Sequence, residues 1–266
     1  MIRLVATDVD GTLVQDSAKD VYPELIEIFK KLQEKGVVIS VASGRQYYSL
    51  RRMFREMGDS ILYIAENGAH IVYEGKTIEA TAMDPVIVRR IIRDARELNE
   101  QYHLIVSTPQ GSYIESRDEY FHDLIANSYC NKVEVLDDVL ATPLSIIKIS
   151  IFCREGMRAI AESAFIPKWK DDVKVCMAGE QWLDFMDLSV DKGHALVKTQ
   201  EKFGISREET MAFGDNNNDV GLLTQASESY AVESAVAEAK DAAKYLCQSY
   251  QEKGVYQVLK ERFSVM

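Results

Sequence analysis

Strand-like and helix-like runs alternate along the first 65 residues of this chain, and this alternation constrains its fold more than any other feature. The strand-like runs are apolar and rich in β-branched residues, and they span 2–7, 37–42 and 61–65. The helix-like runs carry apolar residues at helical spacing, and they span 22–35 and 46–57. Strands bounded by turns and separated by helices indicate βαβ units around a parallel sheet, so the chain is predicted to be an α/β protein.

The pattern changes after Asn67-Gly68 and returns near residue 190. Between these points the sequence first predicts a hairpin. It then predicts helices over 85–102 and near 120–129, and strands near 104–106, near 113–116 and over 146–152. After residue 190, a helix is expected over 192–203 and a strand over 210–213. An α+β insertion of about 100 residues has a normal domain size. We therefore expect core segments at 1–82 and 185–266, interrupted by an inserted domain at 83–184.

The charge of the 266-residue chain argues against several kinds of partner. It has 31 basic and 42 acidic residues, a net charge of −11. Nucleic acids and anionic membrane surfaces attract positive proteins, so neither is expected as a partner, whereas a local pocket could still accept a small anion. No apolar run reaches 18 residues, and the N-terminal segment lacks the features of a signal peptide, which predicts a cytoplasmic protein without a transmembrane helix. The sequence does not indicate an oligomeric state.

The first candidate for chemistry is Asp8-Val9-Asp10-Gly11-Thr12, directly after the first strand. Loops at the carboxyl ends of the strands form the active-site crevice of α/β sheets. Two carboxylates one residue apart could serve as a nucleophile and metal ligand and as a proton donor and acceptor. The alternative is an acidic turn, because Asp-Gly is a common turn dipeptide.

Two further candidates stand at expected helix starts. Ser43-Gly44-Arg45 follows the second strand, where a hydroxyl and backbone N–H groups could face an anion. Taken alone, however, the pattern favours an ordinary N-cap. Arg45 and the basic residues of the following helix are expected on a solvated face. Lys192 begins a helix, where the dipole disfavours a cation unless an anion lies nearby.

The fourth candidate is Gly214-Asp215-Asn216-Asn217-Asn218-Asp219, after the strand at 210–213. Its carboxylates and amides are oxygen ligands of the kind that Mg²⁺ takes. An EF-hand starting at Asp215 would need Gly and Glu where Val220 and Ala226 stand, so that calcium loop is excluded. The common nucleotide, zinc and serine-hydrolase motifs are also missing from the sequence.

Taken in order, these four segments resemble the haloacid dehalogenase superfamily, whose motifs are D-x-D-G-T, a Ser or Thr after the second strand, a Lys, and G-D-x-x-x-D. The turn Asn67-Gly68-Ala69, the triplet Asp191-Lys192-Gly193 and the insertion between the second and third motifs are similar to the Cof-type branch with a large α/β (type IIB) cap. The resemblance implies a Rossmannoid core, a parallel sheet with helices on both faces, carrying an inserted α+β cap. It also implies a phosphohydrolase that works through an aspartyl-phosphate and Mg²⁺.

The resemblance assigns roles to the residues that match the motifs. Asp8 would attack phosphorus and bind Mg²⁺, and Asp10 would give its backbone carbonyl to the metal. The side chain of Asp10 would protonate the leaving oxygen and later deprotonate the attacking water. Lys192 would neutralise the phosphoryl group and Asp8, and Asp215 would be the other carboxylate on the metal. Transfer of a phosphoryl dianion needs this kind of fixed positive charge.

The remaining matched residues would hold the phosphoryl oxygens. These are the backbone amides of Val9 and Gly44, the Ser43 hydroxyl and, as a polar contact, Asn218. Two residues would support the site: Thr12 and Asp219. The chain departs from the family at Asn216 and Asn217 and in the segment 249–255, where the family's Asn and Asp are replaced. Those departures concern substrate contacts rather than the proposed catalytic atoms.

Three functions fit the motifs. The resemblance favours a Mg²⁺-dependent phosphatase of small phosphorylated metabolites, with sugar phosphates as the preferred class. A phosphosugar mutase of the same architecture would need arginines that hold a second phosphate, but the four arginines on the helix expected at 85–102 have the spacing of a solvated face. A phosphosugar sensor without catalysis is disfavoured by the intact Asp8 and Asp10 pair.

Overall fold

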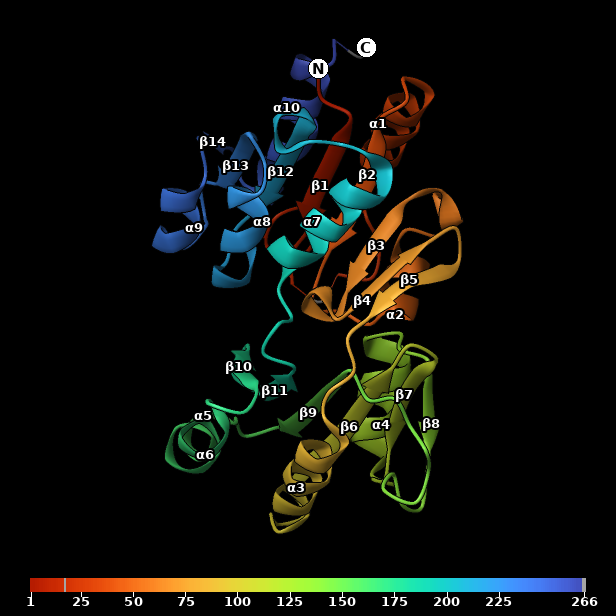
Figure 1. The fold of residues 1–266 in the computed structure, drawn as a ribbon, viewed down its shortest axis with the longest axis vertical. Coiled ribbons are helices and arrows are strands. Elements are labelled where there is room, and N and C mark those ends of the chain that lie inside the picture. Colours follow the sequence, from red (N-terminus) through yellow and green to blue (C-terminus); the bar gives the residue numbers. More distant parts are fainter. Residues whose placement is uncertain (17, 265–266) are drawn as a thin grey trace. The chain divides into compact units, whose positions relative to one another are not determined.

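The computed structural model describes residues 1–16 and 18–264, which form two compact units (Figure 1). The core unit comprises Met1–Ile78 and Asp191–Met266, and the cap unit comprises Glu79–Val190. These divisions lie a few residues away from the ones expected from the sequence, at 82/83 and 184/185. The assignment of the two parts as functional domains stays a prediction.

An eight-stranded sheet organises the core unit. Its strand order is β14-β13-β12-β1-β2-β3-β4-β5, and the strands from β14 to β3 are parallel, whereas β4 runs antiparallel to β3. The strands are β1 (Leu4–Asp8), β2 (Val38–Ala42), β3 (Leu62–Ala65), β4 (His70–Tyr73), β5 (Lys76–Ala80), β12 (Thr210–Gly214), β13 (Glu228–Val232) and β14 (Tyr245–Cys247). The helices are α1 (Pro23–Glu34), α2 (Tyr47–Met53), α7 (Lys192–Phe203), α8 (Val220–Thr224), α9 (Ala237–Ala242) and α10 (Gly254–Arg262).

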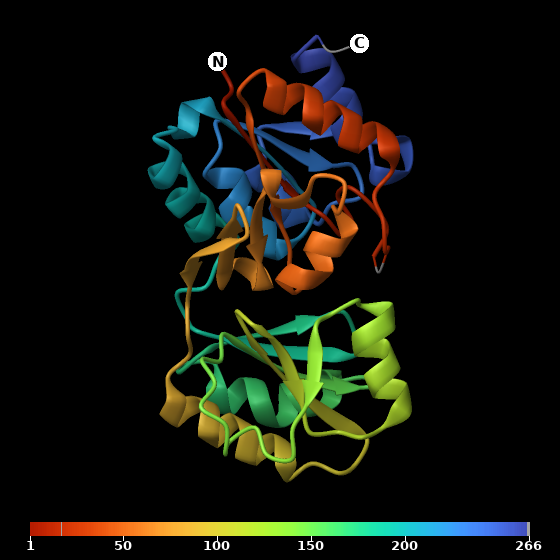
Figure 2. The ribbon, with the colours of Figure 1, turned by 90° about the vertical axis from the view of Figure 1, so that its right-hand side faces the viewer.

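The chain leaves β1 and β12, which are neighbours, in opposite directions along the sheet. The connection from β1 through α1 leads to β2 on one side, and the connection from β12 through α8 leads to β13 on the other. Because such crossovers are right-handed, α1 and α8 lie on opposite faces, where α1 packs on α10 and α8 packs between α7 and α9 (Figure 2). The carboxyl ends of β1 and β12 therefore form a topological switch point, where ligands bind in open α/β sheets.

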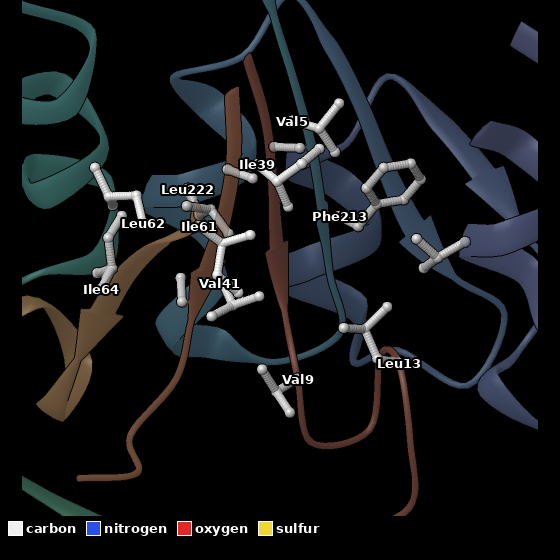
Figure 3. Packing of buried hydrophobic residues seen from close by; sticks show 14 of the residues in the cluster. Val5, Val9, Leu13, Ile39, Val41, Ile61, Leu62, Ile64, Phe213 and Leu222 are labelled. Carbon is white, nitrogen blue, oxygen red and sulfur yellow. The ribbon is translucent and has the colours of Figure 1, made fainter. Parts of the chain in front are cut away.

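The centre of the core unit is apolar on both faces of the sheet, as expected for parallel strands covered by helices. Val5, Ile39 and Phe213 from adjacent strands are fully buried, and Leu222 of α8 belongs to the same apolar cluster (Figure 3). Val9 and Leu13 extend this cluster beyond the end of β1. The loop that carries Asp8 and Asp10 is thus anchored by buried apolar side chains on either side of the carboxylates.

His70 of β4 is a buried titratable residue in this core. Its Nε2 lies 2.9 Å from Thr77 Oγ1, and burial lowers its pKa to about 4. In the unfolded chain the imidazole of His70 is protonated near pH 6.5, whereas in the folded protein it is protonated only near pH 4. We therefore expect the free energy of unfolding to fall as the pH drops from about 6.5 toward 4. His70→Gln should flatten this decline in urea titrations at several pH values. The exposed control His122→Gln should keep the wild-type decline, and a decline in His70→Gln as steep as in the wild type would contradict the assignment.

The cap unit has its own mainly antiparallel sheet, with the strand order β10-β11-β9-β6-β7-β8. Its strands are β6 (Tyr102–Thr108), β7 (Gly111–Ile114), β8 (Val133–Val135), β9 (Lys148–Cys153), β10 (Lys174–Ala178) and β11 (Trp182–Met186). Its helices are α3 (Pro85–Arg96), α4 (Glu119–Asp123), α5 (Arg158–Ile160) and α6 (Ile166–Trp169). Alternate residues of β9 enter two clusters: Ile149 and Ile151 pack with residues of α3 and α6, and Phe152 packs with Phe121 of α4.

Several sequence expectations for these elements are corrected by the structure. The helix expected over 85–102 ends at Arg96, because Asn99 forms a turn in which its side chain accepts a hydrogen bond from the Gln101 amide, and Tyr102 already begins β6. Strands β8, β10 and β11 were not predicted, since their apolar alternation is short or interrupted by polar residues. The helix expected over 46–57 is shorter, with α2 ending at Met53.

No helix in the part of the chain that the structure describes is both long and apolar enough to span a membrane.

Candidate active site

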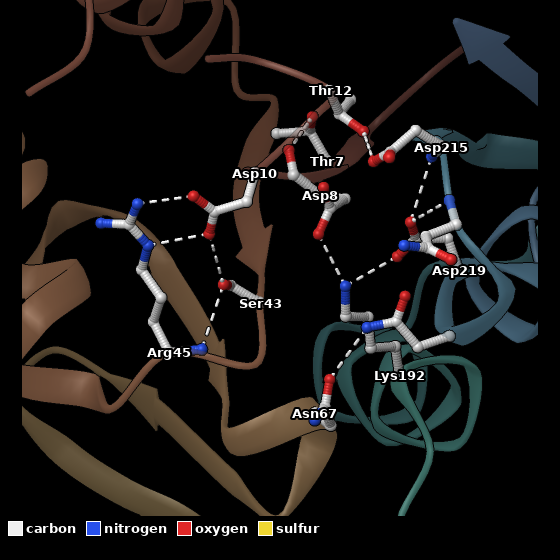
Figure 4. A network of polar contacts seen from close by, with 12 residues as sticks. Thr7, Asp8, Asp10, Thr12, Ser43, Arg45, Asn67, Lys192, Asp215 and Asp219 are labelled. Carbon is white, nitrogen blue, oxygen red and sulfur yellow. Dashed lines mark hydrogen bonds and ion pairs between the residues drawn. The ribbon is translucent and has the colours of Figure 1, made fainter. Parts of the chain in front are cut away.

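The sequence motifs meet at the switch point of the core sheet (Figure 4). Asp8 is the last residue of β1, and Asp215 directly follows β12, which is the neighbour of β1. Lys192 is the first residue of α7, and its Nζ lies 2.6 Å from Asp8 Oδ1. Residues separated by about 200 positions in the chain therefore share one site because parallel strands end at the same edge of the sheet.

Lys192 is the cationic centre of this site. Its side chain is only 1% exposed, and its Nζ donates to Asp8 Oδ1 at 2.6 Å and to Asp219 Oδ1 at 2.7 Å. Burial alone lowers the pKa of a lysine, but the carboxylates of Asp219 and Asp8 outweigh it and hold the pKa of Lys192 above its ordinary value. These ion pairs compensate for the cation at the start of α7, and Asp191 caps that helix by accepting from the Gly193 and His194 amides.

Asp8, Asp215 and Asp219 form an acidic triad whose ligand oxygens lie within 4.8 Å of one another. Burial raises the pKa of Asp8 well above its ordinary value and the nearby Asp219 carboxylate raises it further, although Lys192 acts in the opposite direction. Burial also raises the pKa of Asp215. Such a crowded set of oxygens is typical of a site that is completed by a cation.

The three carboxylates differ in how many of their oxygens are already engaged. Asp219 uses both, since Oδ1 accepts from Lys192 and Oδ2 accepts from the Asp215 and Asn216 amides at 3.1 and 3.0 Å. Asp8 Oδ2, by contrast, is buried and has no hydrogen-bond partner among the described residues. Asp8 and Asp215 therefore have oxygen available for a metal or a substrate, whereas Asp219 orients Lys192.

Thr12 and Gly11 fix the position of Asp215. The Thr12 hydroxyl donates to Asp215 Oδ1 at 2.7 Å. Gly11 has a φ of +89°, and a Cβ at this position would collide with the Asp215 carboxylate. Only glycine combines this backbone conformation with so close an approach, which explains the glycine of the first motif.

Asp10 and Arg45 form an ion pair that the sequence pattern does not indicate. Arg45 Nη2 lies 2.5 Å from Asp10 Oδ1 and Arg45 Nε lies 2.8 Å from Asp10 Oδ2, and the arginine side chain is only 12% exposed. Arg45 also donates to the Ala18 carbonyl at 2.8 Å. The expectation of a solvated face is therefore wrong for Arg45. The available signal was its position two residues after Ser43, in the loop that faces the first motif.

The Ser43–Gly44 loop lies beside this ion pair but does not begin a helix. The Ser43 hydroxyl accepts from the Arg45 amide at 3.1 Å and lies 3.4 Å from Asp10 Oδ2, and α2 starts only at Tyr47. The expected helix start is thus corrected to a tight turn between β2 and α2. The structure brings Ser43 and Asp10 together at the carboxyl ends of β2 and β1.

Asn218 and Val9 complete the set of residues expected at the site. The Asn218 Nδ2 donates to Asn67 Oδ1 at 3.0 Å. The side chain of Val9 is buried in the core, so only its backbone is available to a ligand. The site role of Asn67 was also missed, since its sequence context indicated only a turn.

The arrangement agrees with the comparisons to known proteins. A sequence model of haloacid dehalogenase-like hydrolases matches residues 5–259. The Escherichia coli (strain K12) protein 5-amino-6-(5-phospho-D-ribitylamino)uracil phosphatase YbjI is 27% identical, and the match covers 97% of this chain and 95% of that protein. A crystal structure from Eubacterium rectale is 32% identical with a TM-score of 0.88 over 98% of this chain and 99% of that chain.

A further comparison concerns the fold alone. The subclass IIB sugar phosphatase BT4131 has a TM-score of 0.79 to this chain at 21% identity, with 99% of this chain and 100% of that chain covered. Since the family match spans nearly the whole chain, the chain belongs to the haloacid dehalogenase-like hydrolases. Within that family it is a Cof-type phosphatase whose α/β core carries an inserted cap.

Proposed function

We propose that this phosphatase hydrolyses phosphate monoesters of small metabolites in a Mg²⁺-dependent reaction, with Asp8 as the nucleophile. The observation that carries the proposal is the state of the Asp8 carboxylate. One oxygen is fixed by Lys192 at 2.6 Å, and the other is buried without a hydrogen-bond partner among the described residues. An oriented and desolvated carboxylate oxygen at a topological switch point is suited to attack phosphorus.

The residues of the site fit a divalent cation. If the three carboxylates of the triad are ionised, Lys192 leaves a net charge of −2, since Arg45 already neutralises Asp10. Hard carboxylate oxygens are the ligands that Mg²⁺ prefers, and we assign this role to Asp8 and Asp215 together with the Asp10 backbone carbonyl. Bound there, Mg²⁺ would supply positive charge that stabilises the transferring phosphoryl group.

The residues of the chain would then act in two half-reactions. In the first, an Asp8 oxygen forms a bond to phosphorus while the ester P–O bond breaks. Asp10, which takes up a proton from solvent and leaves its ion pair with Arg45 before this step, donates that proton to the leaving oxygen. In the second, Asp10 takes a proton from a water that attacks the aspartyl-phosphate, and phosphate is released with Asp8 restored. Lys192, the Ser43 hydroxyl, Asn218 and the backbone amides of Val9 and Gly44 hold the phosphoryl oxygens, with Thr12 and Asp219 as supports.

Metal binding is expected to change the stability of the protein. Since burial and mutual repulsion raise the pKa values of Asp8 and Asp215, stability in the absence of metal is lost as the pH rises through these values. Mg²⁺ binds the folded protein only, so at a concentration one hundred times its Kd it should raise the free energy of unfolding by about 2.7 kcal/mol at pH 7. Asp8→Asn should be more stable than the wild type in EDTA and should gain less from Mg²⁺.

Thermal unfolding in EDTA and at increasing Mg²⁺ concentrations measures both effects. The exposed Asp16→Asn is the control, and it should respond to Mg²⁺ as the wild type does. A wild-type transition temperature that does not change with Mg²⁺ would contradict the metal assignment.

Sugar or sugar-alcohol phosphates are the proposed substrate class. The related Escherichia coli protein is named as the phosphatase of a compound with a phosphorylated ribityl chain. Phosphate release over a panel of phosphorylated sugars, sugar alcohols, nucleotides and cofactors tests the proposal, with and without Mg²⁺. Isomerisation of hexose 1-phosphate without phosphate release would instead indicate a mutase, and phosphosugar binding without turnover would indicate a sensor. The cytoplasmic location expected from the sequence stays a prediction.

A further inference from the structure

The turn after β3 has an uncommon backbone. Glu66 and Asn67 both have left-handed conformations, with φ values of 51° and 57°. Both residues are also buried, at 1% and 8% exposure. Left-handed residues with a Cβ cost free energy, and two in succession persist only where the surrounding structure holds them. The turn is therefore maintained by its neighbours, and its contacts indicate its role.

The backbone of this turn holds the Ser43–Gly44 loop. The Asn67 amide donates to the Ser43 carbonyl at 2.9 Å, and the Glu66 amide donates to the Arg45 carbonyl at 3.0 Å. These two bonds fix the carbonyls on either side of Gly44. We assign the Gly44 amide and the Ser43 hydroxyl to the binding of phosphoryl oxygens. The position of both groups is thus fixed by the turn that follows β3.

The side chain of Asn67 reaches a second phosphate-binding segment. Its Oδ1 accepts from Asn218 Nδ2 at 3.0 Å, across 151 positions of the chain (Figure 4). The same amide packs on Gly44, where a Cβ would lie 3.2 Å from Asn67 Oδ1 and 3.3 Å from Nδ2. One side chain therefore contacts both the loop after β2 and the loop after β12.

We propose that Asn67 is a positioning residue that orients the Asn218 amide and the Ser43–Gly44 loop for phosphate binding. Asn218 Nδ2 carries two hydrogens in a fixed plane. Donation of one of them to Asn67 determines the direction of the other, which can then point to a phosphoryl oxygen. The left-handed conformation of Asn67 brings its short side chain to this place. The inference rests on the proposed phosphatase function, because it assumes that this pocket binds phosphate.

Two substitutions separate the effect of losing the Asn67 side-chain amide from the effect of strain in the Asn67 backbone. Asn67→Gly removes the amide but tolerates the left-handed conformation, whereas Asn67→Ala removes the amide and keeps the strain. Both variants should raise the Kd for inorganic phosphate in the presence of Mg²⁺ about fivefold, the effect of one lost hydrogen bond. Both should raise KM for a phosphate ester more than they lower kcat. Only Asn67→Ala should lower the unfolding temperature markedly.

The control for strain is Glu74→Gly, in the exposed β4–β5 turn, where Glu74 has a φ of 52°. It should leave the phosphate Kd unchanged. Asn218→Ala tests whether Asn67 acts through Asn218. If it does so in part, the increase in phosphate Kd in the double variant Asn67→Gly/Asn218→Ala should be smaller than the product of the increases in the two single variants.

Calorimetric titration with inorganic phosphate and thermal unfolding decide the inference. The inference would be overturned if Asn67→Gly bound phosphate as tightly as the wild type. It would also be overturned if the phosphate Kd rose only in variants with a lowered unfolding temperature, or if the effects on binding were fully additive in the double variant. The proposed function fails separately, if the wild type releases no phosphate from any ester of the panel. The phosphate titration does not depend on turnover, so it still tests the role of Asn67 in that case.

Discussion

Asp8→Asn is expected to abolish phosphatase activity while the protein stays folded. The amide is nearly the same size as the carboxylate, but it cannot attack phosphorus, so the aspartyl-phosphate cannot form. Loss of a covalent step should lower kcat by at least about 10³-fold, which corresponds to more than about 4 kcal/mol of barrier. Asp8 Oδ1 is bound to Lys192 at 2.6 Å, so the substitution also removes one partner of a buried ion pair.

The loss of that ion pair makes a control for folding necessary. Lys192 keeps Asp219 as a second partner at 2.7 Å, and burial raises the pKa of Asp8 in the wild type, so the substitution should not unfold the protein. Thermal unfolding and circular dichroism of Asp8→Asn test this, and Asp16→Asn should keep full activity. If Asp8→Asn retained more than about a tenth of the wild-type kcat, Asp8 would not be the nucleophile.

Much of the core could be predicted because its signals are local. The βα alternation defines the parallel strands, and the helix expected over 192–203 is α7 as the structure has it. Lys192 was identifiable because a cation at a helix start is unfavourable without anionic neighbours, and Asp8 and Asp219 are those neighbours. Such an inference uses only the residue type and its position in a helix.

Arg45 and Asn67 could not be assigned in this way, because their roles depend on contacts between distant segments. Arg45 follows a strand and precedes other arginines, so helical spacing suggests a solvated face, yet its guanidinium pairs with Asp10, 35 positions away. Asn67 is a typical turn residue, and only the fold brings it to Asn218. Sequence patterns identify which residues face one another within an element, but not which loops meet at the end of a sheet.

The cap was predicted less well for a related physical reason. Its sheet is mainly antiparallel and carries both polar and apolar side chains. Short strands such as β8 and β10 therefore lack the continuous apolar runs of the core strands. The arginines of α3 do lie on an exposed face, and Arg96 pairs there with Glu115 and Asp138. Amphipathic helices give a strong periodic signal, whereas half-exposed strands of three to five residues do not.

Asp10→Asn is expected to separate substrates by their leaving groups. A sugar alkoxide needs a proton as it leaves, so loss of the general acid should lower kcat for alkyl phosphates by about 10²–10⁴-fold. A nitrophenolate leaves without a proton, so the first step on p-nitrophenyl phosphate should be affected less. The second step would lack its base on either substrate, so aspartyl-phosphate should accumulate and the nitrophenyl ester should show a burst.

The ion pair with Arg45 adds a second expectation for this variant. In the wild type the Asp10 carboxylate accepts two hydrogen bonds from the Arg45 guanidinium, at 2.5 and 2.8 Å. An amide balances that charge less well, so Arg45 should attract the phosphate dianion and KM should fall while kcat falls. Burst kinetics, trapping of the phospho-enzyme and steady-state assays with both esters measure these effects, with Asp16→Asn as the control. Equal losses on both esters, with no burst and no trapped phospho-enzyme, would restrict Asp10 to binding the metal through its backbone carbonyl, and the acid–base mechanism would be wrong.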